Sequence, residues 1–165
     1  MFKKFGFSKE LSQEEELAKF LADARKIYAK AIEKELSSLS LDKTVYSVDS
    51  AVVELGLDKE LIETLVEDFV TQIIKYIPIF MMHIENLKKN QEELDYTILR
   101  NLAHKNLGVA RNLRISNAQK ILNELMTKDS LSYLEKCVRI LEAYVIILKP
   151  DIALKTLEHM EIKAS

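Results

Sequence analysis

The 165-residue chain contains no tryptophan, one cysteine, two prolines and three glycines. So little glycine and proline leaves few residues for the tight turns that join β-strands, whereas leucine, glutamate, lysine and alanine favour helix. The single cysteine, Cys137, permits no disulfide framework and no paired-thiol redox motif, which fits a reducing compartment. We expect it to be a small core residue rather than a nucleophile. The composition therefore predicts an all-α, cytoplasmic protein.

Charge and hydropathy exclude further classes of function. The 24 basic and 26 acidic residues are mixed along the chain and give a net charge of −2, so no basic stripe indicates a nucleic-acid partner. No apolar run approaches the ~18 residues of a membrane-spanning helix, and the longest, residues 76–84, contains Pro78 and His83. The opening MFKKFGF lacks the apolar region of a signal peptide. We interpret it as a frayed terminus, with weak contact to a membrane surface as the less favoured alternative.

Apolar residues recur at helical spacing over most of the chain. Ser12 and Glu15 form a capping-box pattern, Gly56 is a helix-ending glycine, and Asp58 and Ser116 are placed to cap helices. Pro78 is expected to kink or divide the helix that contains it. The predicted helices cover residues 12–36, 49–55, 58–87, 95–115, 116–126, 131–148 and 151–160.

A soft boundary falls in the polar stretch before residue 47. Residues 1–46 form an N-terminal extension, mainly one amphipathic helix, and residues 47–165 form the helical bundle. The apolar stripe of that first helix runs from Leu17 to Ile32 and must be covered by something. Packing on the rest of the chain is the expected arrangement, and a homodimer through this helix is the alternative.

The three histidines fit no metal-binding pattern. None of His83, His104 and His159 has a glutamate three residues before it, as di-iron bundles require. The sequence contains no His-Glu-x-x-His motif, no P-loop and no dinucleotide fingerprint. No metal site is predicted. We expect His83 to be partly buried and structural, and His159 to lie near the C-terminal end of the last helix, where it suits the helix dipole.

His104 has neighbours that favour a chemical role. Gly108 lies one helical turn beyond it on the same face, and glycine inside a helix costs ~1 kcal/mol relative to alanine. The close approach of another protein to His104 would explain this glycine. A neutral imidazole near pH 7 is a nucleophile toward a phosphoryl group, and Arg100 and Arg111 on the same face would stabilise its charge. An ordinary surface histidine is the alternative interpretation of the same pattern.

The segment Asp95–Ile115 resembles the histidine helix of the histidine-containing phosphotransfer (HPt) domain, whose pattern is D-x-x-x-L-x-x-x-A-H-x-L-K-G-x-A. The residues in register with that pattern are Asp95, Leu99, Ala103, His104, Gly108 and Ala110. The sequence ELGLDKELIETLVEDFVTQ, residues 54–72, resembles the first helices of the family, and the resemblance covers roughly residues 47–148. The chain has Asn106 and Leu107 where the family usually has an apolar residue and a lysine. Asn106 is expected to hydrogen-bond across the bundle or to mark a slight rotation of the helix.

The resemblance implies an antiparallel four-helix bundle of HPt type, with the N-terminal helix added. It implies that His104 accepts a phosphoryl group from a receiver-domain aspartate or a sensor kinase relay and passes it on, so the protein is a phosphocarrier rather than a metabolic enzyme. No cofactor is expected, because the Mg²⁺ would be held by the receiver. The residues expected to contact the phosphate or the partner are Arg100, Lys105, Leu107, Gly108 and Arg111. Two alternatives remain: an HPt-like docking or dimerisation module without phosphorylation, and an ordinary bundle with an unrelated ligand.

Overall fold

The computed structural model describes residues 12–43 and 46–164, and within these ranges every regular element is a helix. The predicted all-α class is therefore confirmed. The helices are α1 (Gln13–Glu33), α2 (Val48–Leu55), α3 (Lys59–Lys89), α4 (Thr97–Asn112), α5 (Ser116–Thr127), α6 (Leu131–Leu148) and α7 (Pro150–Ala164), with a short 3₁₀ turn at Ser37–Leu39. None of the helices in these ranges combines the length and the apolar character needed to cross a bilayer.

Local sequence signals place several helix ends correctly. The capping box at α1 is present: the Glu15 amide donates to the Ser12 hydroxyl, and the Ser12 amide donates to the Glu15 carboxylate. Gly56 ends α2 with a φ of 65°, the left-handed conformation that glycine adopts without strain. The cap predicted at Ser116 is wrong, because Ile115 occupies the N-cap position of α5.

Helix α3 is continuous through Pro78, so the expected division does not occur. Ile77 and Phe80 on either side of the proline are buried in the core, which holds both halves in one helix. The first turns of α3 bury Ile62 and Val66, whereas Leu61 is 45% exposed. The series 62, 66, 69, 73 follows the 3.6-residue helical period more closely than 61, 65, 69 does.

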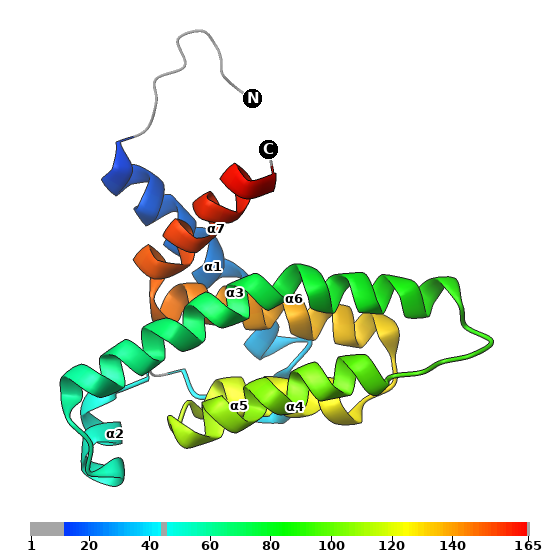
Figure 1. The fold of residues 1–165 in the computed structure, drawn as a ribbon, viewed down its shortest axis with the longest axis horizontal. Helices are drawn as coiled ribbons and strands as arrows, with labels where there is room; N and C mark the ends of the chain where they lie inside the picture. Colours follow the sequence, from blue (N-terminus) through cyan, green and yellow to red (C-terminus); the bar gives the residue numbers. More distant parts are fainter. Residues whose placement is uncertain (1–11, 44–45, 165) are drawn as a thin grey trace, which may run out of the picture.

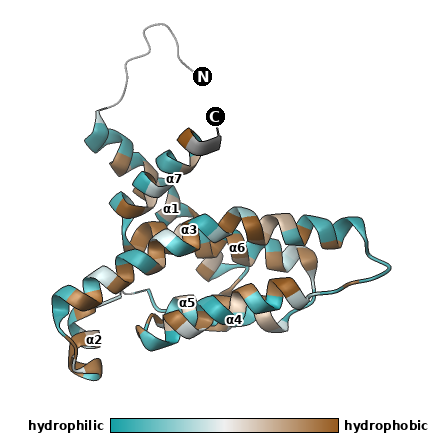
Figure 2. Cartoon of the chain, in the orientation of Figure 1, coloured by the Kyte–Doolittle hydropathy of each residue, from teal (hydrophilic) through white to brown (hydrophobic). Residues whose placement is uncertain are grey.

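The helices are arranged in two layers with a side group (Figure 1). Helix α3 packs on α6, α4 packs on α5, and contacts of α3 with α4 and of α5 with α6 link the two pairs into a ring. Helices α1 and α7 pack on each other and on this group, α1 mainly on α6 and α7 mainly on α3. Figure 2 shows that most of the helices have one hydrophobic and one hydrophilic side, as the apolar spacing predicts.

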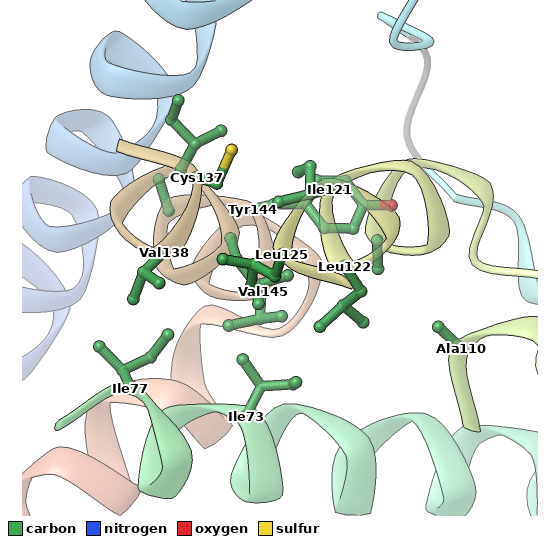
Figure 3. Close-up of a cluster of buried hydrophobic side chains, with 14 of the residues drawn as sticks. Ile73, Ile77, Ala110, Ile121, Leu122, Leu125, Cys137, Val138, Tyr144 and Val145 are labelled. Atoms are coloured by element: carbon green, nitrogen blue, oxygen red, sulfur yellow. The ribbon is translucent and has the colours of Figure 1, made fainter. Parts of the chain in front are cut away.

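One apolar core joins the layers (Figure 3). It includes Ile73 of α3, Leu122 of α5 and Val145 of α6, all fully buried. Helix α1 buries Ala24, Tyr28, and Ala31 in the same core, so this face of the N-terminal helix is covered within the chain. The largest fully buried side chains of α3 are Phe69, Phe80, Ile62, Ile73, Ile74 and Ile84.

Candidate functional site

Helix α4 places His104 at the surface. The buried side of α4 consists of Leu99, Ala103, Asn106, Leu107 and Ala110, and it faces α5 and α3. His104 is exposed on the opposite side. Ala103 beside it is fully buried, so α4 sits close to the core while the imidazole faces solvent. The ring is therefore open to a partner molecule.

Gly108 leaves open space one turn beyond His104. A methyl group built on its α-carbon would meet nothing within 4 Å among the described residues. Packing inside the described chain therefore gives no reason for glycine at this position, and its backbone does not adopt the left-handed conformation. The bare helix surface next to His104 is the feature that the sequence singled out, and it is present in the fold.

Lys105 is held toward α3. Its Nζ donates to the hydroxyl of Tyr76 at 2.9 Å and lies 5.5 Å from the centre of the Tyr76 ring. The Lys105 hydrogen bond also lowers the pKa of the Tyr76 phenol, since the ammonium group favours the phenolate. Lys105 remains exposed and directly follows His104 in α4, about 100° further around the helix.

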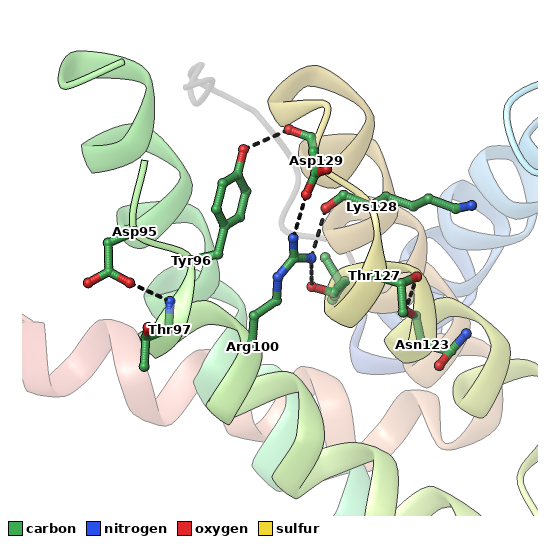
Figure 4. A network of polar contacts seen from close by, with 9 residues as sticks. Asp95, Tyr96, Thr97, Arg100, Asn123, Thr127, Lys128 and Asp129 are labelled. Carbon is green, nitrogen blue, oxygen red and sulfur yellow. Dashed lines mark hydrogen bonds and ion pairs between the residues drawn. The ribbon is translucent and has the colours of Figure 1, made fainter. Parts of the chain in front are cut away.

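Arg100 has a structural role that the sequence did not reveal (Figure 4). Its Nη1 donates to the carbonyl groups of Leu125 at 2.9 Å and Lys128 at 2.8 Å, and its Nη2 pairs with Asp129 at 2.8 Å. The guanidinium group also lies 4.5 Å from the centre of the Tyr96 ring. These contacts hold the Arg100 side chain at the end of α5, where it is 21% exposed, so its role there is structural. Its expected contact with a phosphate stays a prediction.

We expect Arg100→Met to lower the free energy of unfolding by about 2 kcal/mol, because two carbonyl groups lose charge-assisted hydrogen bonds. The methionine keeps the apolar stem, so the change isolates the guanidinium group. Urea denaturation measures the effect. Arg111→Met on the same helix is the matched control and should change stability little; equal losses in the two variants would contradict the assigned role.

Arg111 and Leu107 differ in what they offer to a partner. Arg111 is exposed, and its guanidinium group makes no hydrogen bond or ion pair with the described residues. It lies two turns beyond His104 on α4, within reach of an anion bound there. Leu107 is only 4% exposed and belongs to the core, so its predicted contact with a partner is corrected.

Asn106 is completely buried, and only one of the two polar atoms of its side-chain amide has a hydrogen-bond partner. Its Nδ2 donates to the carbonyl of Leu102 in the same helix at 2.8 Å, while its Oδ1 has no hydrogen-bond partner among the described residues. The expected hydrogen bond across the bundle is therefore absent at this oxygen. A buried polar atom without a partner destabilises the folded state.

Asn106→Leu should raise the free energy of unfolding by about 1 kcal/mol. The substitution removes the unpaired oxygen and fills a similar volume with apolar atoms. Thermal unfolding followed by circular dichroism measures it. Asn101→Leu, at an exposed position of α4, is the control and should not stabilise the fold to the same degree.

The two other histidines and the cysteine lie outside the candidate site. His83 is half-buried on α3, and His159 is exposed on α7. Cys137 is fully buried, and burial raises its thiol pKa to about 12, so it is a core residue as predicted and not a nucleophile. Over residues 12–43 and 46–164, no three His, Cys, Asp or Glu side chains gather in a way that would hold a metal ion.

Asp95 supports the start of the histidine helix. Its Oδ1 accepts a hydrogen bond from the Thr97 amide at 2.9 Å, and hydrogen bonding to Thr97 lowers the pKa of the carboxyl group. The helix itself begins at Thr97, two residues later than expected.

No family model, curated protein or solved structure matches this chain. Its function is therefore inferred from the surface of α4. That surface combines an exposed imidazole, His104, with a bare turn at Gly108 and two cations, Lys105 and Arg111.

Proposed function

We propose that this protein is a cytoplasmic histidine phosphotransfer protein of a two-component phosphorelay. His104 accepts a phosphoryl group from the aspartate of a receiver domain, or from a sensor kinase relay, and hands it on. The observation that carries the proposal is the exposed His104 one turn from Gly108, with open space where a side chain would stand. Residues four apart share a helix face, so a partner can approach the imidazole along this bare turn.

The transfer needs only the imidazole as a nucleophile from this chain. The lone pair of one ring nitrogen attacks phosphorus, and a nitrogen–phosphorus bond forms. The bond between phosphorus and the aspartate oxygen breaks, and its electron pair stays on the carboxylate. The other ring nitrogen keeps its proton, so the ring carries a positive charge next to the phosphoryl group. Atoms and charge balance without a further reactant.

Lys105 and Arg111 would stabilise the negative oxygens of the group in transfer. Lys105 is suited to this because its ammonium group is already held by Tyr76 and does not need to be ordered during the reaction. The Mg²⁺ that assists the transfer would be held by the receiver domain, and the proposal places no cofactor on this chain.

The surface near His104 suits a protein partner. Ile98 on α4 is 58% exposed, and Met82 on α3 is 51% exposed. Helices α3 and α4 run in opposite directions and Tyr76 faces Lys105, so Met82 lies at about the level of Ile98. Exposed apolar side chains on the helix that carries a reactive group and on the neighbouring helix can contribute to a protein-binding surface. This supports a phosphocarrier rather than an enzyme acting on a small metabolite.

The fold is compatible with this assignment. Helices α3, α4, α5 and α6 each contact the next in a ring, and we assign these four to the HPt-type bundle. The histidine would then lie on the second of the four helices. Helix α1 is the added N-terminal helix and covers the outer side of α6.

The test is incubation of the full chain with a panel of receiver domains carrying ³²P on their aspartates. We expect the label to move to this protein and to be stable in alkali and lost in acid, as phosphohistidine is. Absence of label across the whole panel would contradict the proposal. Labelling that survives acid would also contradict it, because it would indicate a hydroxyl phosphate ester.

A docking or dimerisation module without phosphorylation is the second candidate. The observation in its favour is that Arg100 is engaged at the end of α5, which leaves Lys105 and Arg111 as the cations on the His104 side of α4. Leu107 is buried and offers a partner no surface there. Stable binding of a receiver domain without transfer of label would support this alternative over phosphotransfer.

A further inference from the structure

A cavity of about 350 Å³ lies between α1, the segment around Asp42 and the C-terminal half of α6, on other elements than His104. Its volume is at the lower end of the range of about 300–1,000 Å³ found for small-molecule sites. The lining residues that matter to its chemistry are Tyr28, Ala29, Tyr46, Asn117 and Tyr144.

One wall of the cavity is fixed by hydrogen bonds. The Nδ2 of Asn117 donates to the Tyr28 hydroxyl and to the Asp42 carbonyl, each at 2.8 Å, and its Oδ1 accepts from the Asp42 amide at 2.9 Å. Asn117 is only 3% exposed. The hydroxyl of Tyr46 donates to the carbonyl of Leu113 at 2.7 Å, so a second tyrosine is also held in place. The cavity is thus formed by ordered side chains before any ligand enters.

Tyr144 supplies a polar group with no hydrogen-bond partner among the described residues. Its side chain is 5% exposed, and its ring centre lies 5.4 Å from that of Tyr28 at an angle of 38°. Its hydroxyl makes no hydrogen bond with the described residues, and Figure 3 shows it pointing away from the apolar cluster around Ile73 and Val145. Burial raises the pKa of this phenol, so the hydroxyl keeps its proton and remains a donor. The hydroxyl belongs to a residue that lines the cavity, so it can donate to a molecule bound there.

The charges around the cavity balance. Arg25 and Lys43 carry positive charge at its edge, and Glu33 and Asp42 carry negative charge. The lining therefore attracts neither anions nor cations strongly. The accessible lining is otherwise mainly aromatic and aliphatic, which favours a flat apolar molecule.

We propose that this cavity binds a neutral, flat heteroaromatic molecule that packs against Tyr28 and Tyr144 and accepts a hydrogen bond from the Tyr144 hydroxyl. This binding site is independent of the proposed phosphotransfer at His104. The two tyrosine rings supply the apolar contact, and the Tyr144 hydroxyl supplies the orientation.

The test uses three probes that share one ring system at pH 7.5: quinoline, 1-methylquinolinium and quinoline-6-carboxylate. Quinoline is neutral and carries an acceptor nitrogen, whereas the other two carry a positive and a negative charge. Binding to the full ¹⁵N-labelled chain is followed by amide chemical shifts. We expect saturable shifts with quinoline in residues 25–33 and 144–148, and at least tenfold weaker binding of both charged probes.

Two variants and one control test the Tyr144 hydroxyl and the cavity wall. Tyr144→Phe removes only the hydroxyl and should weaken quinoline binding about fivefold, the loss of one hydrogen bond. Tyr76→Phe, the same change at a half-buried tyrosine of α3 that does not line the cavity, is the matched control and should not alter quinoline binding. Ala29→Phe adds a ring at the cavity wall and should abolish binding, with thermal unfolding as the check that the variant folds.

The proposal is overturned if quinoline gives no saturable shifts, or if those shifts lie away from the cavity. It is also overturned if Tyr144→Phe binds quinoline as tightly as the natural chain, or if a charged probe binds more tightly than quinoline. If Ala29→Phe does not fold, the Tyr144→Phe and Tyr76→Phe pair still decides the question.

Discussion

His104→Gln is expected to lose all receiver-dependent phosphorylation, at least a hundredfold below the natural chain, while unfolding at nearly the same temperature. Glutamine is polar and of similar size but has no nucleophilic ring nitrogen. The imidazole is exposed and makes no hydrogen bond or ion pair with the described residues, so its replacement should change the free energy of unfolding by less than about 0.5 kcal/mol.

The measurement is the rate at which ³²P moves from a phosphorylated receiver to each variant. His159→Gln, an exposed histidine on α7, is the matched control and should accept the label at the natural rate. Equal labelling of His104→Gln and the natural chain would place the acceptor on another residue and remove His104 from the mechanism.

Gly108→Gln should reduce the transfer rate about a hundredfold or more and should also make the fold more stable. The Gln side chain would occupy the space through which the partner reaches His104, and a displacement of about 1 Å from the reacting geometry is enough for such a loss. Stability should rise by up to about 1 kcal/mol, because glycine is a poor helix former and a Cβ meets nothing in the described chain. Gly108→Ala should give the gain in stability with a smaller loss of rate.

Opposite effects on stability and transfer distinguish a docking role for Gly108 from a packing role. Urea denaturation and the label-transfer assay are run on the same preparations. Ala18→Gln, a similar enlargement at an exposed position of α1, is the control and should leave transfer unchanged. If Gly108→Gln transfers at the natural rate, the bare turn does not serve partner approach.

Helix positions could be predicted from the sequence where the signal is local. The bounds of α6, the capping box at Ser12 and the glycine that ends α2 all depend on residues close together in the chain. The continuity of α3 through Pro78 could not be predicted in this way. It depends on the packing of Ile77 and Phe80 against other helices, which outweighs the local preference of proline.

For the candidate site, too, local features could be predicted from the sequence and long-range contacts could not. The exposure of His104 follows from the apolar spacing of α4, which places the opposite side of the helix in the core. The contacts of Arg100 with Leu125, Lys128 and Asp129 join positions 25 to 29 residues apart, and no local pattern marks them. The pairing of Lys105 with Tyr76 is equally distant in sequence, at 29 residues. Because of these contacts, Arg100 has a structural role at the end of α5, and Lys105, the residue after His104, has its ammonium group held by Tyr76.

The most direct measurement is mass spectrometry of the tryptic peptide Asn101–Lys105, taken after mixing the chain with phosphorylated receiver domains and kept in alkaline buffer throughout. This peptide, NLAHK, contains His104 and no serine, threonine, tyrosine or aspartate. Phosphotransfer predicts that it gains the mass of one phosphoryl group and loses it on acid treatment. An unmodified peptide with every receiver, or a phosphoryl group found on a different peptide, would contradict the assignment of His104.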